Sequence, residues 1–99
     1  MTAYNIVRMR VKPESLDEFL TYYRERPMDL DGLRGLTIVR TGERDFCFIG
    51  EWTGMDALAS ARPRMIANLD EHRDKLEDLG GGLGVTDPVS GEAVVERRA

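Results

Sequence analysis

The fold is decided by the stretch Phe46-Cys47-Phe48-Ile49-Gly50-Glu51-Trp52, an apolar segment that ends in the only tryptophan of the chain. Successive side chains of a strand point to opposite faces, so Phe46, Phe48 and Trp52 share one face. Gly50 lies on the same face and adds no side chain to it. Large aromatic residues around such a gap form either a packed core or an aromatic-walled pocket, and both interpretations stay open.

Residues on both sides of this stretch predict the order strand, helix, strand, strand, helix, strand. Ser15 followed by Glu18 is a capping-box pattern that begins the first helix, which ends by Pro27. Gly42-Glu43-Arg44-Asp45 has turn composition, so the strands that flank it form a hairpin, and Asp87-Pro88-Val89-Ser90-Gly91 predicts another turn. The expected strands cover Tyr4–Val11, Gly35–Arg40, Phe46–Trp52 and Ala93–Val95.

The second helix is expected from Met55 to Leu79, with an interruption in the middle. Proline in a helix interior costs about 3 kcal/mol, so a break or kink is predicted at Ala61-Arg62, with Pro63 opening the next segment. Gly80-Gly81-Gly82 is expected to end this helix.

This order predicts an α+β fold, the ferredoxin-like βαββαβ unit, with an antiparallel sheet and two helices on one face. A chain of 99 residues is expected to form a single domain over residues 1–99. The hairpin strands carry apolar residues on both faces, whereas two helices can cover only one. The uncovered face therefore predicts a homodimer, a dimeric α+β barrel in which two sheets meet face to face.

Composition argues against several classes of partner. The net charge is −4, and no cluster of basic residues offers a nucleic-acid surface. No apolar run approaches the ~20 residues of a membrane span. The single cysteine, Cys47, fits a reducing compartment and a role as a small hydrophobic side chain, and one histidine with one cysteine cannot supply a usual metal site. We therefore expect a cytoplasmic protein without a metal, nucleic-acid or membrane partner.

His72 is the single histidine, and it is placed on the apolar stripe of the second helix, three residues after Leu69 and four before Leu76. One interpretation is a histidine that is satisfied by a hydrogen-bond partner near the charged flank of the helix. The other is a proton relay or an axial haem ligand, since an unperturbed pKa of about 6.5 suits both roles.

Two short motifs carry a resemblance to a known family. Val11-Lys12-Pro13 runs from the first strand into the helix at Leu16-Asp17-Glu18-Phe19-Leu20, and Ile49-Gly50-Glu51-Trp52 runs into the helix at Met55-Asp56-Ala57-Leu58. With these motifs the chain resembles the dimeric α+β barrel proteins, and most closely the antibiotic biosynthesis monooxygenase domain family. The resemblance spans roughly residues 4–79.

The resemblance implies a homodimer with a pocket between sheet and helices. Some members oxidise polycyclic aromatic compounds with O₂ and no cofactor, others bind and degrade haem, and many have no known activity. Trp52 matches the tryptophan at the strand end of the family, and Asn5 lies on the first strand as in the aromatic oxidases. Ala61 stands where many members carry a histidine, and this departure weakens the case for both aromatic oxidation and haem degradation.

The first hypothesis is a small cofactor-independent monooxygenase that acts on a phenol-like or quinol-like substrate. An alternative is a non-catalytic dimeric module that binds a small molecule or is purely structural, and a third is a haem-degrading monooxygenase. For the first hypothesis the catalytic candidates are His72, as the base, and Asn5, and no cofactor is expected. The substrate-binding candidates are Trp52, Phe48, Tyr22, Tyr23 and Arg40.

Overall fold

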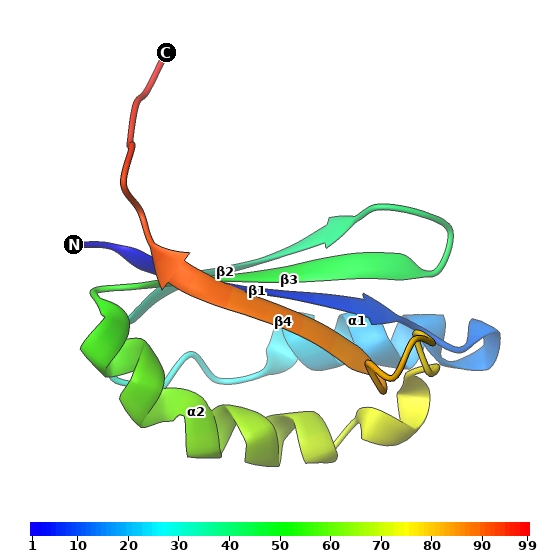
Figure 1. The fold of residues 1–99 in the computed structure, drawn as a ribbon. Coiled ribbons are helices and arrows are strands. Elements are labelled where there is room, and N and C mark those ends of the chain that lie inside the picture. The colour runs from blue at the N-terminus through cyan, green and yellow to red at the C-terminus, as the bar shows by residue number, and fades with distance from the viewer.

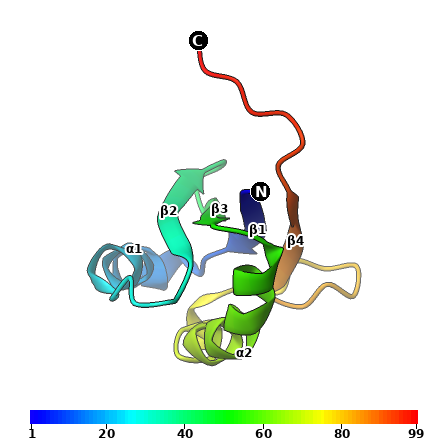
Figure 2. The ribbon, with the colours of Figure 1, turned by 90° about the vertical axis from the view of Figure 1, so that its left-hand side faces the viewer.

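The computed structural model describes residues 1–99 and contains one four-stranded antiparallel sheet with the strand order β2-β3-β1-β4. Both helices lie on the same side of this sheet (Figure 1), and a view along the strands shows no helix on the other side, from which the C-terminal tail extends (Figure 2). The predicted ferredoxin-like βαββαβ fold is confirmed. The elements are β1 (Ala3–Arg10), α1 (Leu16–Glu25), β2 (Leu33–Arg40), β3 (Asp45–Trp52), α2 (Met55–Asp70) and β4 (Thr86–Glu92), with short 3₁₀ turns at Pro13–Ser15 and Arg73–Lys75.

The inner face of the sheet is built from alternate residues of the two central strands. Met9 of β1 lies opposite Phe46 of β3, and Asn5 lies opposite Gly50. The predicted alternation therefore places the aromatic residues of β3 toward the helices. Two buried clusters fill this layer; they consist of Met9, Val11, Phe19, Phe46 and Leu76, and of Ala3, Trp52, Leu58 and Ala61.

The capping box predicted at Ser15 is wrong. The Ser15 side chain makes no capping hydrogen bond, and its backbone angles (φ −111°, ψ 4°) differ from the extended conformation of a helix-capping residue. The chain enters α1 through the 3₁₀ turn at Pro13–Ser15 instead, in which the Ser15 N–H donates to the Lys12 carbonyl at 2.9 Å. A turn of this kind satisfies a backbone donor without a side-chain cap.

Pro63 does not divide the second helix, contrary to the prediction of a new segment at that residue. α2 runs continuously from Met55 to Asp70 with Pro63 inside it, and the ribbon curves along its course (Figure 1). Pro63 and Ala59, the residue one turn before it, are both exposed. The Ala59 carbonyl, which lacks its helical donor because proline has no N–H, can therefore be hydrated, and this lowers the cost of the proline.

α2 ends at Asp70, nine residues before the predicted end, so His72 is not a helix residue. The chain turns after Asp70, and Leu76 forms an isolated antiparallel bridge with Val11. The Lys12 N–H donates to the Lys75 carbonyl at 2.9 Å. These backbone bonds to the end of β1 compete successfully with further helical bonds, and they bring His72 into the interior.

The prediction of the last strand is wrong as well. β4 covers Thr86–Glu92, the segment predicted as a turn, whereas Ala93–Val95 lies beyond the strand. β4 is an edge strand and bonds only to β1, with Pro88 opposite Val7. A strand with one neighbour tolerates proline, because the missing N–H can fall on the open side.

The outer face of the sheet carries an apolar row across the strands. Ile6 of β1 lies opposite Ile49 of β3 on one side and Val89 of β4 on the other. Ile6 is 39% exposed and Val89 is 61% exposed. No helix packs on this face (Figure 2).

Neither helix of the protein is long and apolar enough to span a bilayer.

Candidate functional site

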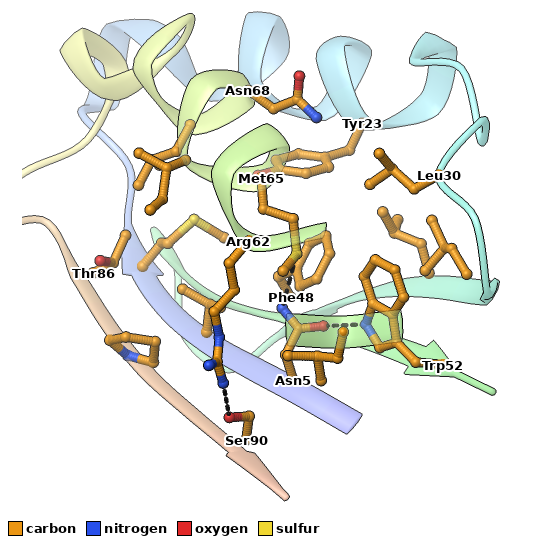
Figure 3. A pocket seen from close by; sticks show the side chains of 18 of the residues that line it. Asn5, Tyr23, Leu30, Phe48, Trp52, Arg62, Met65, Asn68, Thr86 and Ser90 are labelled. Atoms are coloured by element: carbon orange, nitrogen blue, oxygen red, sulfur yellow. Dashed lines mark hydrogen bonds between the residues drawn. The ribbon is translucent and has the colours of Figure 1, made fainter. Parts of the chain in front are cut away.

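A cavity of about 470 Å³ lies between the inner sheet face and the helices. Most of the residues that line it are hydrophobic, and Figure 3 shows them converging from β1, β3, β4 and both helices. This is the size and character of a site for a small organic ligand. Among the apolar residues are Val7, Phe48, Trp52, Leu58, Met65 and Leu69, and the polar ones are Asn5, Tyr23, Arg26, Arg62, Asn68, His72, Thr86 and Ser90.

Asn5 and Trp52 form a buried hydrogen-bonded pair at the floor of the cavity (Figure 3). The Trp52 indole Nε1 donates to Asn5 Oδ1 at 2.7 Å. Because an indole N–H can only donate, it fixes the orientation of the Asn5 amide. The amide nitrogen then points the other way, where Nδ2 meets only the weak acceptor Met65 Sδ at 3.8 Å. Asn5 therefore keeps donor capacity for an oxygen atom of a ligand.

Gly50 makes this pair possible. A Cβ atom at Gly50 would lie 2.3 Å from Asn5 Oδ1 and 3.0 Å from Trp52 Nε1. The open space that the sequence predicted over Gly50 is thus occupied by the Asn5 amide, which lies opposite Gly50 in the strand register. The glycine serves the hydrogen bond and does not itself enlarge the cavity.

Tyr23 and His72 form a second polar pair on the cavity wall. The Tyr23 hydroxyl lies 2.9 Å from His72 Nε2, and His72 Nδ1 lies 3.0 Å from the Asn68 carbonyl. A carbonyl oxygen can only accept, so Nδ1 carries the hydrogen and donates to Asn68, while Nε2 of the neutral ring accepts from Tyr23. His72 is almost completely buried, at 1% exposure.

Burial keeps both members of this pair neutral. Loss of hydration lowers the pKa of His72, and the positive charge of Arg26 lowers it further, whereas the hydrogen bond to Asn68 acts in the opposite direction. Burial raises the pKa of Tyr23 far above its usual range. At neutral pH His72 is therefore an unprotonated base with Tyr23 as its immediate proton donor.

The structure gathers five of the seven predicted site residues around the cavity: Asn5, Phe48, Trp52, Tyr23 and His72. Tyr22 lies behind the wall, where its ring packs against His72 at a centroid distance of 4.3 Å and its hydroxyl donates to the Asn68 carbonyl at 3.1 Å. Arg40 lies elsewhere, over the Phe46 ring at 5.5 Å, in a second hollow beside α1. Arg40 therefore does not contact the main cavity.

The sequence interpretation missed several polar or charged residues of the site. Arg62 is four residues after Leu58 and three before Met65, so a charged residue on an inward stripe was a signal that could have found it. Arg26 and Asn68 left no comparable signal. Ser90 was assigned to a turn, and only its true place in β4, opposite Asn5, brings it to the cavity.

The haem-ligand role considered for His72 does not fit these residues. Both ring nitrogens are engaged, one by Tyr23 and one by Asn68, and the ring is buried. No group of three or more His, Cys, Asp and Glu side chains is arranged to hold a metal ion. Cys47 lies on the outer sheet face opposite Arg8, away from the cavity. The chain thus offers no free imidazole or thiolate to a haem iron at this site.

Comparison with known proteins finds similarity in structure but not in sequence. The chain matches no protein-family model and no curated protein. Rv0793 from Mycobacterium tuberculosis superposes with a TM-score of 0.74 at 12% identity over 99% of this chain and 100% of the other. A candidate antibiotic biosynthesis monooxygenase from Chloroflexus aurantiacus gives 0.71 at 11% identity over 99% and 98%. The chain has the fold of these proteins.

A further match is the R26S mutant of MhuD, in a structure with two manganese protoporphyrin IX molecules per active site. It gives a TM-score of 0.66 at 14% identity over 98% of this chain and 99% of the other. The fold implied by the resemblance to the antibiotic biosynthesis monooxygenase family is therefore confirmed. Identities of this size carry no residue roles from those proteins to this one.

Proposed function

We propose that the protein binds a phenol-like or quinol-like aromatic molecule in the cavity and oxidises it with O₂ as a cofactor-independent monooxygenase. The observation that carries this proposal is the Tyr23–His72 pair, a neutral base and its proton donor on the wall of an otherwise apolar cavity. The structural similarity to a candidate monooxygenase supports it at the level of the fold only.

The pair can deprotonate a bound phenol through one relay. Tyr23 Oη accepts the substrate proton while its own hydroxyl proton passes to His72 Nε2. The imidazolium that forms keeps its Nδ1–H on the Asn68 carbonyl. The Asn5 amide can donate to a second oxygen of the substrate, and the apolar walls hold the ring and exclude water.

The phenolate then supplies the electrons for oxygen transfer. A phenol that takes up one oxygen atom of O₂ and loses its hydroxyl hydrogen and one ring hydrogen becomes a quinone, and the second oxygen atom leaves as water. The protein contributes the proton acceptor and the orientation of the ring, while the substrate itself reduces O₂.

Oxygen uptake and absorbance with a panel of hydroquinones test this proposal directly. Tyr23→Phe removes the relay hydroxyl and is expected to lower turnover about 100-fold, the lower range for a general acid–base group. Tyr22→Phe, the matched control, removes a hydroxyl that lies behind the wall and is expected to change turnover far less. Equal losses in the two variants would contradict the relay.

A non-catalytic binding module remains the second candidate function. The observation in its favour is that both polar pairs are already satisfied within the protein, because Asn5 bonds Trp52 and His72 bonds Tyr23 and Asn68. Saturable binding of an aromatic molecule without oxygen uptake by any member of the panel would support this function over the first.

We also propose that two copies pair through the outer sheet face. Ile6, Ile49 and Val89 form an uncovered apolar row there, between the Arg8–Asp87 ion pair on one side and Tyr4 on the other. An apolar centre with a polar rim is the composition of a protein interface.

A further inference from the structure

The charges that line the cavity are all of one sign. Arg26 and Arg62 are its only charged residues, and no aspartate or glutamate lines it. The chain as a whole is acidic, with a net charge of −4. Positive charge around an apolar hollow in an acidic protein favours ligands that carry negative charge.

Arg62 lies at the mouth of the cavity between α2 and β4. Its Nη2 atom donates to Ser90 Oγ at 3.0 Å, so the guanidinium reaches from the helix to the edge strand (Figure 3). Arg62 takes part in none of the ion pairs of the protein. By contrast, Arg64, two residues further along α2, pairs with Asp29 at 3.1 Å. The positive charge at the mouth thus has no carboxylate of the protein beside it.

Ser90 connects this charge to the floor of the cavity. It lies opposite Asn5 in the pairing of β4 with β1, and Asn5 in turn contacts Met65 of α2. The Ser90 oxygen accepts from Arg62, which leaves its hydroxyl hydrogen free to donate. A guanidinium and a hydroxyl therefore converge on one point, at the end of a path that runs inward over Asn5 to the aromatic floor.

Arg26 is less suited to hold an anion. Its guanidinium carbon lies over the rings of Tyr22 and Tyr23, at 5.5 Å and 5.9 Å from their centroids. Stacking of this kind already uses the cation, whereas Arg62 meets only a neutral hydroxyl.

We infer that the cavity selects an anionic aromatic ligand, with the rings over Asn5 and Trp52 and the negative group held by Arg62 and Ser90 at the mouth. A carboxylate or sulfonate matches the planar fork of the arginine. This inference rests on the proposed function in one respect, since both need an aromatic molecule in the same cavity.

Two fluorescent probes with the same ring skeleton test the inference. 8-Anilinonaphthalene-1-sulfonate carries a sulfonate, and N-phenyl-1-naphthylamine is its neutral counterpart. Dissociation constants for both are measured by fluorescence titration with wild type, Arg62→Gln, Arg62→Lys, Arg26→Gln and the control Arg64→Gln. Circular dichroism melts confirm that each variant is folded before it is titrated.

The wild type is expected to bind the sulfonate at least tenfold more tightly than the neutral probe. Arg62→Gln is expected to raise the dissociation constant of the sulfonate probe about tenfold or more, which is the size of a lost charge-assisted hydrogen bond. The dissociation constant of the neutral probe is expected to stay within about twofold of the wild-type value. Arg62→Lys, which keeps the charge but not the fork, is expected to fall between the two. Arg64→Gln removes the same charge from the same helix and is expected to change neither constant by more than about twofold.

Four results would overturn the inference. Equal wild-type affinity for the two probes would show that the cavity takes aromatics without regard to charge, and the proposed function would survive. If Arg64→Gln weakened sulfonate binding as much as Arg62→Gln does, the anion would not be held specifically by Arg62. If Arg26→Gln weakened sulfonate binding and Arg62→Gln did not, the anion would be held by Arg26 instead. Failure of both probes to bind would also overturn the inference, whereas the proposed function is tested separately by the hydroquinone panel, whose members carry the hydroxyl that Tyr23 accepts from.

Discussion

Gly50→Ala is the substitution for which the structure makes the sharpest prediction. The new methyl group would lie 2.3 Å from Asn5 Oδ1, far inside van der Waals contact, and 3.0 Å from Trp52 Nε1. Asn5 is buried, and Trp52 has no exposed surface. The Asn5 amide must therefore turn away, and the indole N–H is left buried without an acceptor.

The cost follows from the groups that lose their partners. A buried donor without an acceptor costs about 1–3 kcal/mol, and crowding in a packed interior adds about 1–3 kcal/mol. We expect the free energy of unfolding to fall by about 2–6 kcal/mol in total, from the sum of these two terms. For a domain of this size that corresponds to a drop in Tm of at least about 8 °C.

Urea unfolding followed by the fluorescence of Trp52, the only tryptophan, measures this loss. Asn5→Ala supplies the decisive comparison, because it removes the atom that the methyl group would strike. In the Asn5→Ala background, Gly50→Ala is expected to cost at least 1 kcal/mol less than in the wild type, since coupling energies between contacting residues reach about 0.5–3 kcal/mol. Strictly additive losses in the double variant would refute the role assigned to Gly50.

Three further predictions concern the site and the assembly. Trp52→Phe removes the donor to Asn5, so we expect the free energy of unfolding in urea to fall by about 1–3 kcal/mol and the binding of N-phenyl-1-naphthylamine to change. Unchanged binding would exclude Trp52 as a cavity wall. Because the pKa of His72 is lowered in the folded state, the unfolded state takes up the proton first as the pH falls. The free energy of unfolding of the wild type should therefore decrease below about pH 6.5. In pH-dependent melts His72→Gln should lack the part of this decrease that comes from His72. Should turnover of His72→Gln keep the wild-type pH profile between about pH 5 and 8, the relay role is wrong. Sedimentation at micromolar concentration is expected to give a homodimer, and a clean 11.2 kDa monomer would contradict pairing through the outer sheet face.

Local pattern was enough to predict the β2–β3 hairpin and the inner face of β3. The alternation of Phe46, Phe48 and Trp52 fixed which side of β3 faces the helices, and the turn at residues 42–45 fixed the hairpin with β2. Both signals act between neighbouring residues, so no knowledge of the rest of the chain was needed.

The errors fall where distant backbone contacts outweigh local preference. Pro88 indicates a turn until β4 is known to be an edge strand beside β1. The helical stripe through His72 and Leu76 continues in sequence, but backbone bonds to the end of β1 stop the helix at Asp70. Pro63 indicates a break because sequence alone does not reveal that it faces solvent.

The site was predicted in its residue types but not in its connections. Asn5, Trp52, Tyr23 and His72 were all expected, yet neither hydrogen-bonded pair was foreseen. Each pair joins residues 47 or 49 positions apart, and its geometry depends on the strand register and on the turn after α2. Arg40 was misassigned because the end of β2 that carries it lies past the cavity, where its guanidinium group lies over the Phe46 ring.

The two pairs together set the hydrogen-bonding demands on a ligand. Trp52 takes the oxygen of the Asn5 amide, which leaves the amide nitrogen as the donor on the cavity floor. His72 takes the hydroxyl hydrogen of Tyr23, which leaves the lone pairs of Tyr23 Oη as the acceptor on the wall. A fitting molecule therefore presents one acceptor to Asn5 and one O–H to Tyr23 on an aromatic body. A hydroxylated ring with a second oxygen meets these demands, whereas a plain hydrocarbon would engage neither group and would leave the Asn5 amide nitrogen with only the weak acceptor Met65 Sδ.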